Sequence, residues 1–399
     1  MSCTRWSVAV AWLVACGPVM PPLPGRGGPP WVEIKSAHFT LWTDASAERG
    51  RELVGEMEAR RQVIMTAMNH APSTEASLVI ALGSAGEVAA YVPKQFIARA
   101  WSDTNPTSQP GILLDAYNND RDHIVSHELT HVISHAIVQH QPHWLSEGIA
   151  TYFEMADLHS QAASIEIGRP RSDRADQLRS SPPSSAVELF GCREQRCMDA
   201  VFYATSWAMF SYLLNEHFDQ LTHYLQRLNT LPPDHDAEAW RDAFADLPLD
   251  RLDRELNEWL VTGKLRLPRI KVTVTEYPTT QRALSDADVL AARSLLRLTA
   301  AQDPAAARAD SQAALAVDRT NLLARLLEAA FAREISGDDA RATAAAHPDD
   351  WRAWELVARA LRGSSEGDEA FDRMCALATQ RLPHCPGDPP RAESSRAVK

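Results

Sequence analysis

The chain has 399 residues, of which 45% are apolar, so it has room for about two or three domains with a sizeable core. Its formal net charge of −12 argues against a nucleic-acid partner, because little basic surface would offset repulsion by phosphates. No apolar run reaches the roughly eighteen residues that a membrane-spanning helix needs, so we expect a soluble body.

Residues 1–16 have the pattern of a secretory signal. Arg5 precedes the apolar stretch Trp6–Val14, and the small residues Ala15–Gly17 follow it. The end of this segment also resembles a bacterial lipobox, in which Cys16 is lipidated and becomes the new N-terminus. We therefore expect an exported protein, a bacterial lipoprotein at the cell envelope, on its periplasmic face or at the cell surface.

Residues 17–30 are rich in proline and glycine, and we interpret them as a tether between this anchor and the body. The alternative, a buried first helix, is disfavoured because Pro21, Pro22 and Pro24 leave that helix nothing to continue into. A membrane contact is expected only through the lipid anchor.

Strands and then helices are predicted in the first part of the body. Strands are expected within residues 31–43, at 78–82 and at 112–114, and a long amphipathic helix over 47–71. Strands followed by a run of helices indicate an α+β domain. The strand at Ile112–Leu114 could also align a substrate by edge pairing.

The helices that follow carry the chemistry. One helix is expected to begin near Asp122, whose carboxylate can cap it, and to end before Pro142. A second helix covers about 144–155, residues 156–200 are expected to be rich in loops, and helices resume from Tyr203 to about 260. A strand at 271–276 would close a first domain that covers residues 31–278.

Four cysteines remain beyond the N-terminal segment, and they form two close pairs, which is typical of local disulfides in an oxidising compartment. Sequence alone permits three pairings, and the simplest joins neighbours along the chain. Free thiols are the alternative. Zinc binding is less convincing, because neither pair has the usual two-residue spacing. The four residues are Cys192, Cys197, Cys375 and Cys385.

Residues 285–380 are rich in Ala, Leu and Arg, and we expect a separate all-α domain there. Residues 317–323 resemble residues 347–353, thirty positions later, and each segment lies between two expected helices. This arrangement is typical of tetratricopeptide-like repeats, although an ordinary helical bundle is an open alternative. These helices are a candidate surface for a protein partner, and residues 386–399 are expected to be disordered.

The segment His127–Glu128–Leu129–Thr130–His131 holds two histidines one helical turn apart, so both imidazoles can face one metal ion. Glu128 lies beside that position, where a general base can take a proton from a water that zinc acidifies to a pKa of about 7. The alternative is a histidine-rich polar helix face. Of three neighbouring histidine pairs with this spacing, only one has a glutamate directly after its first histidine.

A catalytic zinc ion takes three protein ligands and keeps one open position. In the segment 144–154, Glu147 lies on the polar face of the expected helix, and a reversal around Pro142 would aim it at the histidine pair. The alternative is an ordinary surface carboxylate. We predict that His127, His131 and Glu147 bind Zn²⁺.

The motif His-Glu-x-x-His followed by Trp144–Leu145–Ser146–Glu147–Gly148 resembles the signature of gluzincins, the thermolysin-like and aminopeptidase N-like zinc peptidases. It is more similar still to the bacterial peptidase MA-like group, which shares an opening like His38–Leu41 and a later helix like Tyr203–Trp207. The likeness covers about residues 31–225. It implies a thermolysin-like fold, the same three zinc ligands, and Glu128 as catalytic base and acid.

Some features depart from these families. The spacing between the second histidine and Glu147 is shorter than in thermolysin, and no Gly-x-Met-Glu-Asn motif marks an aminopeptidase. Ser134 and Ile137 stand where the metzincin extension needs Gly and His, which excludes that family.

Further polar residues are candidates for roles around the metal. Tyr203 is the candidate donor to an oxyanion, since aminopeptidase-like relatives place a tyrosine on a downstream helix; simple aromatic packing is equally open. His123, His135 and His143 could orient a ligand or move protons, although for each a partly buried polar side chain is the simpler interpretation.

The sequence thus predicts a zinc metallopeptidase that acts on a peptide or protein substrate. Two other functions stay open. One is a catalytically inactive, peptidase-like scaffold or binding lipoprotein, which the intact Glu128 argues against. The other is a zinc hydrolase of a non-peptide amide or ester, which the same ligands would serve equally well.

Overall fold

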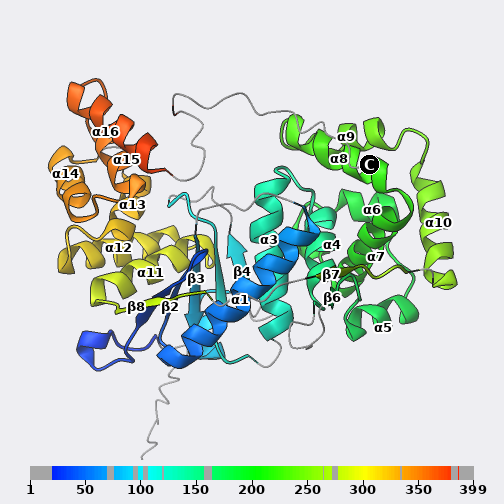
Figure 1. The fold of residues 1–399 in the computed structure, drawn as a ribbon, viewed down its shortest axis with the longest axis horizontal. Helices are drawn as coiled ribbons and strands as arrows, with labels where there is room; N and C mark the ends of the chain where they lie inside the picture. The colour runs from blue at the N-terminus through cyan, green and yellow to red at the C-terminus, as the bar shows by residue number, and fades with distance from the viewer. Residues whose placement is uncertain are drawn as a thin grey trace, which may run out of the picture.

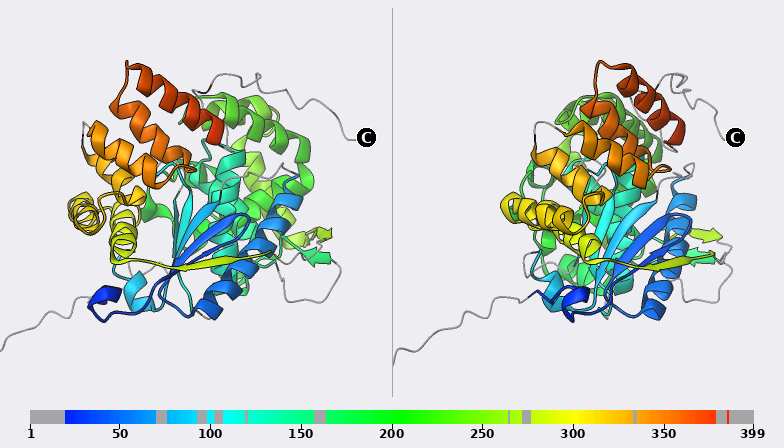
Figure 2. Two further views of the ribbon diagram at one scale, coloured as in Figure 1. Left: turned by 60° about the vertical axis from the view of Figure 1, so that its left-hand side comes forward. Right: turned by 90° about the vertical axis from the view of Figure 1, so that its left-hand side faces the viewer.

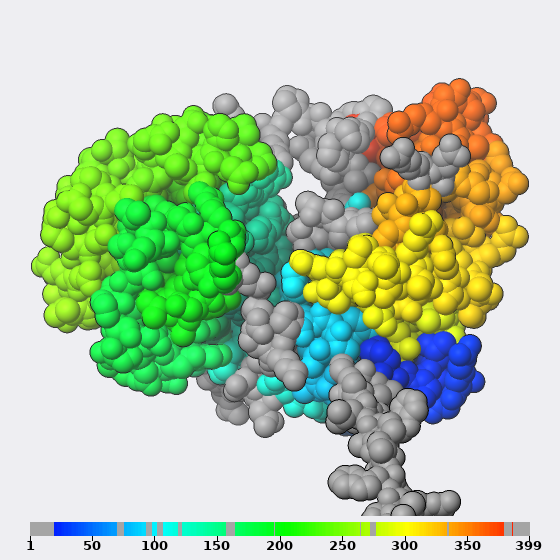
Figure 3. All heavy atoms as spheres, turned by 180° about the vertical axis from the view of Figure 1, so that it is seen from behind, coloured from blue at the N-terminus to red at the C-terminus, as the bar shows by residue number. Residues whose placement is uncertain are grey.

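The computed structural model is a mixed α+β structure whose long axis is horizontal in Figure 1. A central sheet lies between two groups of helices, α5–α10 at one end of the molecule and α11–α16 at the other (Figures 1 and 3). The model describes residues 20–69, 76–92, 98–101, 107–118, 121–156, 164–263, 265–271, 277–332, 335–378 and Cys385.

The central sheet is mixed. Strands β2, β3 and β5 are parallel to one another, whereas β4, β1 and β8 each run antiparallel to their neighbour. Within the described residues its order is β4 (Ala98–Trp101), β5 (Gly111–Asp115), β3 (Ser77–Leu82), β2 (Phe39–Thr43), β1 (Val32–Lys35) and β8 (Thr280–Ala283). A separate ribbon pairs β6 (Ser164–Glu166) with β7 (Arg269–Lys271).

Both faces of this sheet are buried, and successive residues of β3 show it. Val79 and Ala81 belong to the core on one face, and Leu78 and Ile80 to the core on the other. Because side chains alternate between faces along a strand, a strand covered on both sides must be apolar throughout. This explains the continuous apolar run that predicts β3.

The first face is covered by α1 (Ala47–Ala67) and α3 (Arg121–Ile137), and α4 (His143–Phe153) packs beyond them. Every residue of α4 from Trp144 to Phe153 is buried, because this helix lies between α3 and α7. The remaining helices of this end are α5 (Ser172–Ser180), α6 (Ala186–Gly191), α7 (Ala200–Glu216), α8 (Phe218–Thr230), α9 (Asp236–Ala243) and α10 (Leu249–Thr262).

The second face is covered by the first C-terminal helices. Leu295 and Leu327 share a core with Ile80 and Leu113 of the sheet. Figure 2 shows the yellow and orange C-terminal helices beside the sheet. The expected boundary between residues 278 and 285 therefore does not separate two cores. The helices here are α11 (Asp286–Thr299), α12 (Pro304–Val317) and α13 (Leu322–Phe331), with α2 (Ala85–Val88) beside them.

The last helices have a smaller core of their own. Helix α11 packs against α12, and α15 (Trp351–Ala360) packs against α16 (Ser365–Leu377). Helices α13 and α15 each begin at a polar cap, Asn321 and Asp350. These caps lie in the two segments whose likeness suggests a repeat. Helix α14 (Gly337–Ala346) packs against α15.

Residues 20–30 lie against the body rather than apart from it, unlike the expected tether. Leu23 is buried in the second core, and the backbone N–H of Gly25 donates to Asp286 at the start of α11. A short 3₁₀ helix, η1 (Pro24–Arg26), forms here. The proline-rich composition thus specifies a bent, packed segment. The signal and lipobox at 1–16 and the tail at 386–399 lie outside the described residues.

Most predicted elements of the body are present. The exceptions have clear causes. Strand β5 is an inner strand, so Ile112–Leu114 offers no free edge for a substrate. The edge strand next to it is β4, which is too short to be recognised from its sequence. The expected loop at 156–200 contains β6, α5 and α6. The strand at 271–276 lies mostly outside the described part, and β7 begins just before it.

Both neighbouring cysteine pairs are disulfides, Cys192–Cys197 and Cys375–Cys385. The first closes the segment between α6 and α7 and includes the 3₁₀ helix η2 (Gln195–Cys197). Among the described helices, none has the length and apolarity needed to cross a membrane.

Candidate metal centre

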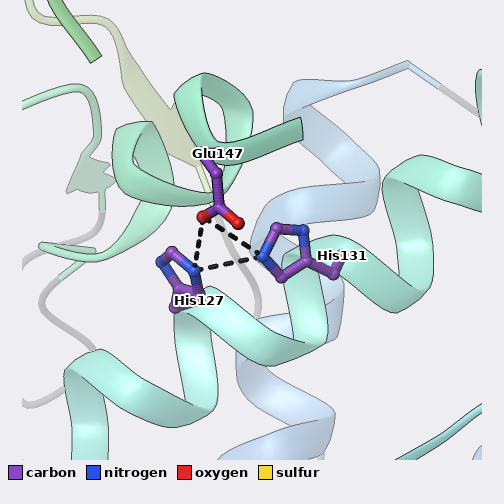
Figure 4. A group of neighbouring side chains, drawn as sticks. All are labelled: His127, His131 and Glu147. Carbon is purple, nitrogen blue, oxygen red and sulfur yellow. Dashed lines mark hydrogen bonds and ion pairs between the residues drawn. The ribbon is translucent and has the colours of Figure 1, made fainter. Parts of the chain in front are cut away.

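The reversal between α3 and α4 brings three side chains to one point. His127 and His131 stand one turn apart on α3, and Pro142 lets the chain turn back and begin α4 at once. Glu147 then projects from α4 toward the two imidazoles, as Figure 4 shows. Within the part of the chain that the structure describes, these three residues are the one group of His, Cys, Asp or Glu that could hold a metal ion.

The three ligand atoms form a small triangle. Nε2 of His127 lies 3.1 Å from Nε2 of His131, and Oε2 of Glu147 lies 3.1 Å and 3.5 Å from these two nitrogens. Ligands held about 2.0–2.1 Å from zinc in a tetrahedron are about 3.3–3.4 Å from one another. The triangle thus has the dimensions of three corners of a zinc tetrahedron.

The bonding around Glu147 also fits a role in binding a cation. Its Oε2 is buried and makes no hydrogen bond, although two imidazoles lie within ion-pair distance. A buried carboxylate oxygen without a hydrogen bond is costly unless a positive charge compensates it. Two neutral imidazoles and one carboxylate are a common ligand set for zinc, but these atoms do not by themselves identify the metal.

The electrostatics of the site favour positive charge. Burial opposes protonation of His127, but the neighbouring carboxylates of Glu147 and Glu154 raise its pKa well above the ordinary value. Burial would raise the pKa of Glu147, yet His131 and His127 lower it below the ordinary range. Without a metal the cluster therefore draws in a proton, which a divalent cation would displace on binding.

Glu154 orients the first histidine from behind. Its Oε1 lies 2.9 Å from Nδ1 of His127, and the side chain is only 4% exposed. Arg174, on α5, approaches the same oxygen at 3.5 Å and lies over the ring of Tyr203. An imidazole whose Nδ1–H is held by a carboxylate keeps its Nε2 lone pair for a metal.

The second histidine has a different partner. Nδ1 of His131 lies 3.0 Å from Oγ of Ser146, and that hydroxyl lies 3.2 Å from Nε2 of His135. Burial, together with the neighbouring His131, lowers the pKa of His135 to about 4. His135 is therefore neutral at pH 7.

A pocket of about 450 Å³ opens over the three ligand atoms. Its floor is formed by α3 and α4, and one wall is β4, from Ala98 to Trp101. Glu128, Tyr203 and His143 also line it, with Met198 just before α7. The structure thus places both predicted catalytic side chains in the same cavity as the predicted ligands.

Tyr203 comes from the first turn of α7, and its ring centre lies 6.5 Å from that of His127. Burial, with the carboxylates of Glu147 and Glu128 nearby, raises the pKa of Tyr203. The phenol is therefore protonated near neutral pH and can donate a hydrogen bond into the pocket.

Gly148 allows α7 to approach this closely. A Cβ atom at Gly148 would lie 2.7 Å from the carbonyl oxygen of Ser206 and 3.0 Å from Cβ of Phe210. Only glycine lets the two backbones pack at this distance, and this contact carries the start of α7 to the site.

The other histidines have different surroundings. His123 approaches the backbone carbonyl of Glu154 at 3.1 Å and does not line the pocket, whereas His143 lines it and is exposed. The sequence does not predict a functional role for Glu154, Ser146 or Arg174. The available signal was spacing, since Glu154 follows Glu147 by seven residues, two turns along the same face of α4.

Residues 123–234 match the model of a family described as a protein of unknown function (DUF1570). The match begins in the first turn of α3 and ends just after α8, so it contains the three candidate ligands, Glu128 and Tyr203. No curated protein matches the sequence.

Proposed function

We propose that this chain is a zinc-dependent metallopeptidase of the gluzincin type. The observation that carries the proposal is the zinc-sized triangle formed by His127, His131 and Glu147, with Glu128 beside it in an open pocket. The thermolysin-like fold and the likeness to peptidase MA-like proteins belong to this proposal, and they rest on the sequence motif.

Each side chain has a defined task in peptide hydrolysis. When bound, zinc supplies a Lewis acid that polarises the scissile carbonyl and brings the pKa of water to about 7. Glu128 takes the proton of the attacking water and passes it to the leaving amine. Tyr203, a protonated phenol, donates a hydrogen bond to the oxyanion.

The position of β4 favours a peptide over a small ester. Within the described residues β4 is one of the two edge strands of the sheet, and it lines the pocket along its whole length, from Ala98 to Trp101. An extended peptide can pair with such an edge through backbone hydrogen bonds, whereas a small ester has no strand to pair.

The test is hydrolysis of an unbiased peptide library by the wild type and by Glu128→Gln, with metal content measured on both. We expect zinc in both proteins and hydrolysis by the wild type alone, with a loss of at least 10²–10⁴-fold in the variant. Glu52→Gln, a change at an exposed carboxylate of α1, is the control and should retain full activity.

The results separate the alternatives. Undiminished turnover by Glu128→Gln would remove the catalytic assignment. A zinc-loaded wild type that cleaves no peptide but cleaves small esters or amides would indicate a non-peptide hydrolase. A protein that binds metal and cleaves neither would be an inactive scaffold.

We also propose that the protein is exported and held at the membrane by lipid on Cys16. Support comes from the two disulfides, which form in oxidising compartments. Cys16→Ser should move the protein from the membrane fraction to the soluble fraction, and an unchanged distribution would contradict the anchor. We further propose that α14–α16 bind a protein partner, because α11 and α13 already pack against the sheet.

A further inference from the structure

A chain of hydrogen bonds extends from the metal cluster to a histidine that is not in it. It runs from Nδ1 of His131 to Oγ of Ser146, at 3.0 Å, and on to Nε2 of His135, at 3.2 Å. His135 lies one turn beyond His131 on α3 and is not part of the ligand group. Ser146 precedes Glu147 on α4, so the chain joins both helices that supply ligands.

The number of protons available determines the donor and the acceptor in each of these hydrogen bonds. A neutral imidazole carries one N–H, so His131 can offer the Nε2 lone pair to a metal only when its proton is on Nδ1. That Nδ1–H then donates to Oγ of Ser146. The hydroxyl has one proton of its own, and in this chain it donates to Nε2 of His135, which must be unprotonated.

If position 135 offered no acceptor, the hydroxyl of Ser146 would be free to donate its proton to another group. It could donate back to Nδ1 of His131, and this bond would favour the tautomer with its proton on Nε2. In that tautomer the nitrogen that faces His127 and Glu147 carries a hydrogen and cannot bind a cation. Ser146 is only 7% exposed, so a water that replaced the lost acceptor would have to enter from the pocket that Ser146 and His135 line.

We propose that Ser146 and His135 are positioning residues that hold His131 in its metal-binding tautomer. His135 acts through Ser146 and binds no metal itself. The inference rests on the proposed coordination by His131, but it does not depend on peptide hydrolysis. His127 is held in the same tautomer by a different group, because the carboxylate of Glu154 accepts its Nδ1–H.

The experiment measures zinc affinity of the full-length protein by competition with a chromophoric chelator. Ser146→Ala and His135→Leu should each weaken affinity about 10–100-fold, the usual effect of losing a partner of a ligating histidine. His135→Gln should stay close to the wild type, because a glutamine carbonyl oxygen can take the place of the imidazole Nε2 as acceptor. His140→Leu, a change at an exposed histidine beyond α3, is the matched control and should have no effect.

A second readout uses metal-free protein. Nitrogen-15 NMR of the histidine rings should show His131 protonated on Nδ1 in the wild type and in His135→Gln, and shifted toward the Nε2–H form in His135→Leu. A variant that merely loosens the fold would lose dispersion of its spectrum without this selective change.

Three results would overturn the inference: unchanged zinc affinity in both Ser146→Ala and His135→Leu, equal weakening by His135→Gln and His135→Leu, or an Nε2–H tautomer of His131 in the wild type. Failure of the proposed function is distinguishable. A protein that binds zinc but cleaves no peptide would defeat the peptidase and leave both measurements able to support the positioning role.

Discussion

Oε1 of Glu154 lies 2.9 Å from Nδ1 of His127, on the side of the imidazole that faces away from the candidate metal. Glu154 directly follows α4 and lies two turns after Glu147, so one face of this helix provides a ligand and the support of another ligand. A carboxylate in this position fixes the tautomer of the histidine and makes its Nε2 more basic.

Replacement of Glu154 should therefore weaken metal binding without removing any ligand. We expect Glu154→Ala to reduce zinc affinity about 10–100-fold, and Glu154→Gln to have a smaller effect, because its amide oxygen still accepts the Nδ1–H. Chelator competition measures both. Glu166→Ala, which removes a half-buried carboxylate that pairs with Arg169 and Arg269 outside the pocket, is the control. Equal affinity in Glu154→Ala and the wild type would show that His127 needs no support from this side.

The ligands could be predicted from sequence because they lie within two adjacent helices. Spacing within a helix determines which side chains share a face, and Pro142 forces the reversal that places Glu147 opposite the histidine pair. Arg174 could not be predicted in this way. It comes from α5, which is separated from α4 by a segment with little periodicity, and only tertiary packing brings it to the site.

The strands of the sheet could be predicted, but not the burial of its second face. The continuous apolar runs of β3 and β5 indicate strands covered on both sides, yet they do not say which helices cover them. The apolar positions of α11, such as Leu295 and Leu296, were equally compatible with a separate bundle. Strand β8 was missed because its four residues are all exposed and carry no apolar pattern.

Tyr203 should affect turnover and not metal binding. Its hydroxyl is proposed to donate to the oxyanion, an interaction that strengthens only in the transition state. We expect Tyr203→Phe to lower kcat about 10²–10³-fold with little change in KM. Steady-state kinetics on a cleaved peptide, with zinc content measured in parallel, tests this. Because the pKa of Tyr203 is raised, its loss should leave the pH profile near neutrality unchanged.

The control for this variant is Tyr212→Phe on the same helix, where the hydroxyl donates to Glu255. It should leave kcat unchanged. If Tyr203→Phe kept full activity, the tyrosine would serve only as packing beside Phe202 and His127.

Gly148→Ala should destabilise the protein and weaken zinc binding together. An alanine inside a helix usually stabilises it relative to glycine, but here the new Cβ would meet the Ser206 carbonyl at 2.7 Å, and a backbone atom cannot move aside cheaply. We expect a loss of about 1–3 kcal/mol in the free energy of unfolding, measured with urea, and weaker zinc affinity because α4 must shift with Glu147.

Gly55→Ala is the matched control, since it lies inside α1 with nothing within 4 Å of a new Cβ. It should stabilise by about 0.5–1 kcal/mol. Similar gains from both substitutions would mean that α4 and α7 separate without cost, and that close packing does not position Glu147.

Glu58 should make stability depend on pH at acid values. Its buried carboxylate accepts hydrogen bonds from the Ser36 hydroxyl at 2.7 Å and from the His38 backbone N–H at 2.9 Å, and it pairs with the His38 ring at 2.7 Å. Burial would raise the pKa of Glu58, but these partners outweigh burial and lower it. A carboxylate whose pKa is lower in the folded state stabilises the protein above the unfolded value of about 4.3, and this contribution is lost as the pH falls through the folded value.

The prediction concerns the difference between two proteins, because Glu147 and Glu154 also have lowered pKa values that make stability depend on pH. At pH 7 we expect Glu58→Gln to lower the free energy of unfolding by about 1–3 kcal/mol relative to the wild type, since the charged acceptor of three hydrogen bonds is lost. Near pH 3 this difference should shrink, because below about pH 4.3 the unfolded chain binds a proton at Glu58 and the charged folded form loses part of its advantage. Urea titrations of the metal-free proteins at both pH values measure it, with Glu52→Gln at an exposed site as the control. A difference that stayed constant between pH 7 and pH 3 would mean that Glu58 acts through packing and not through its charge.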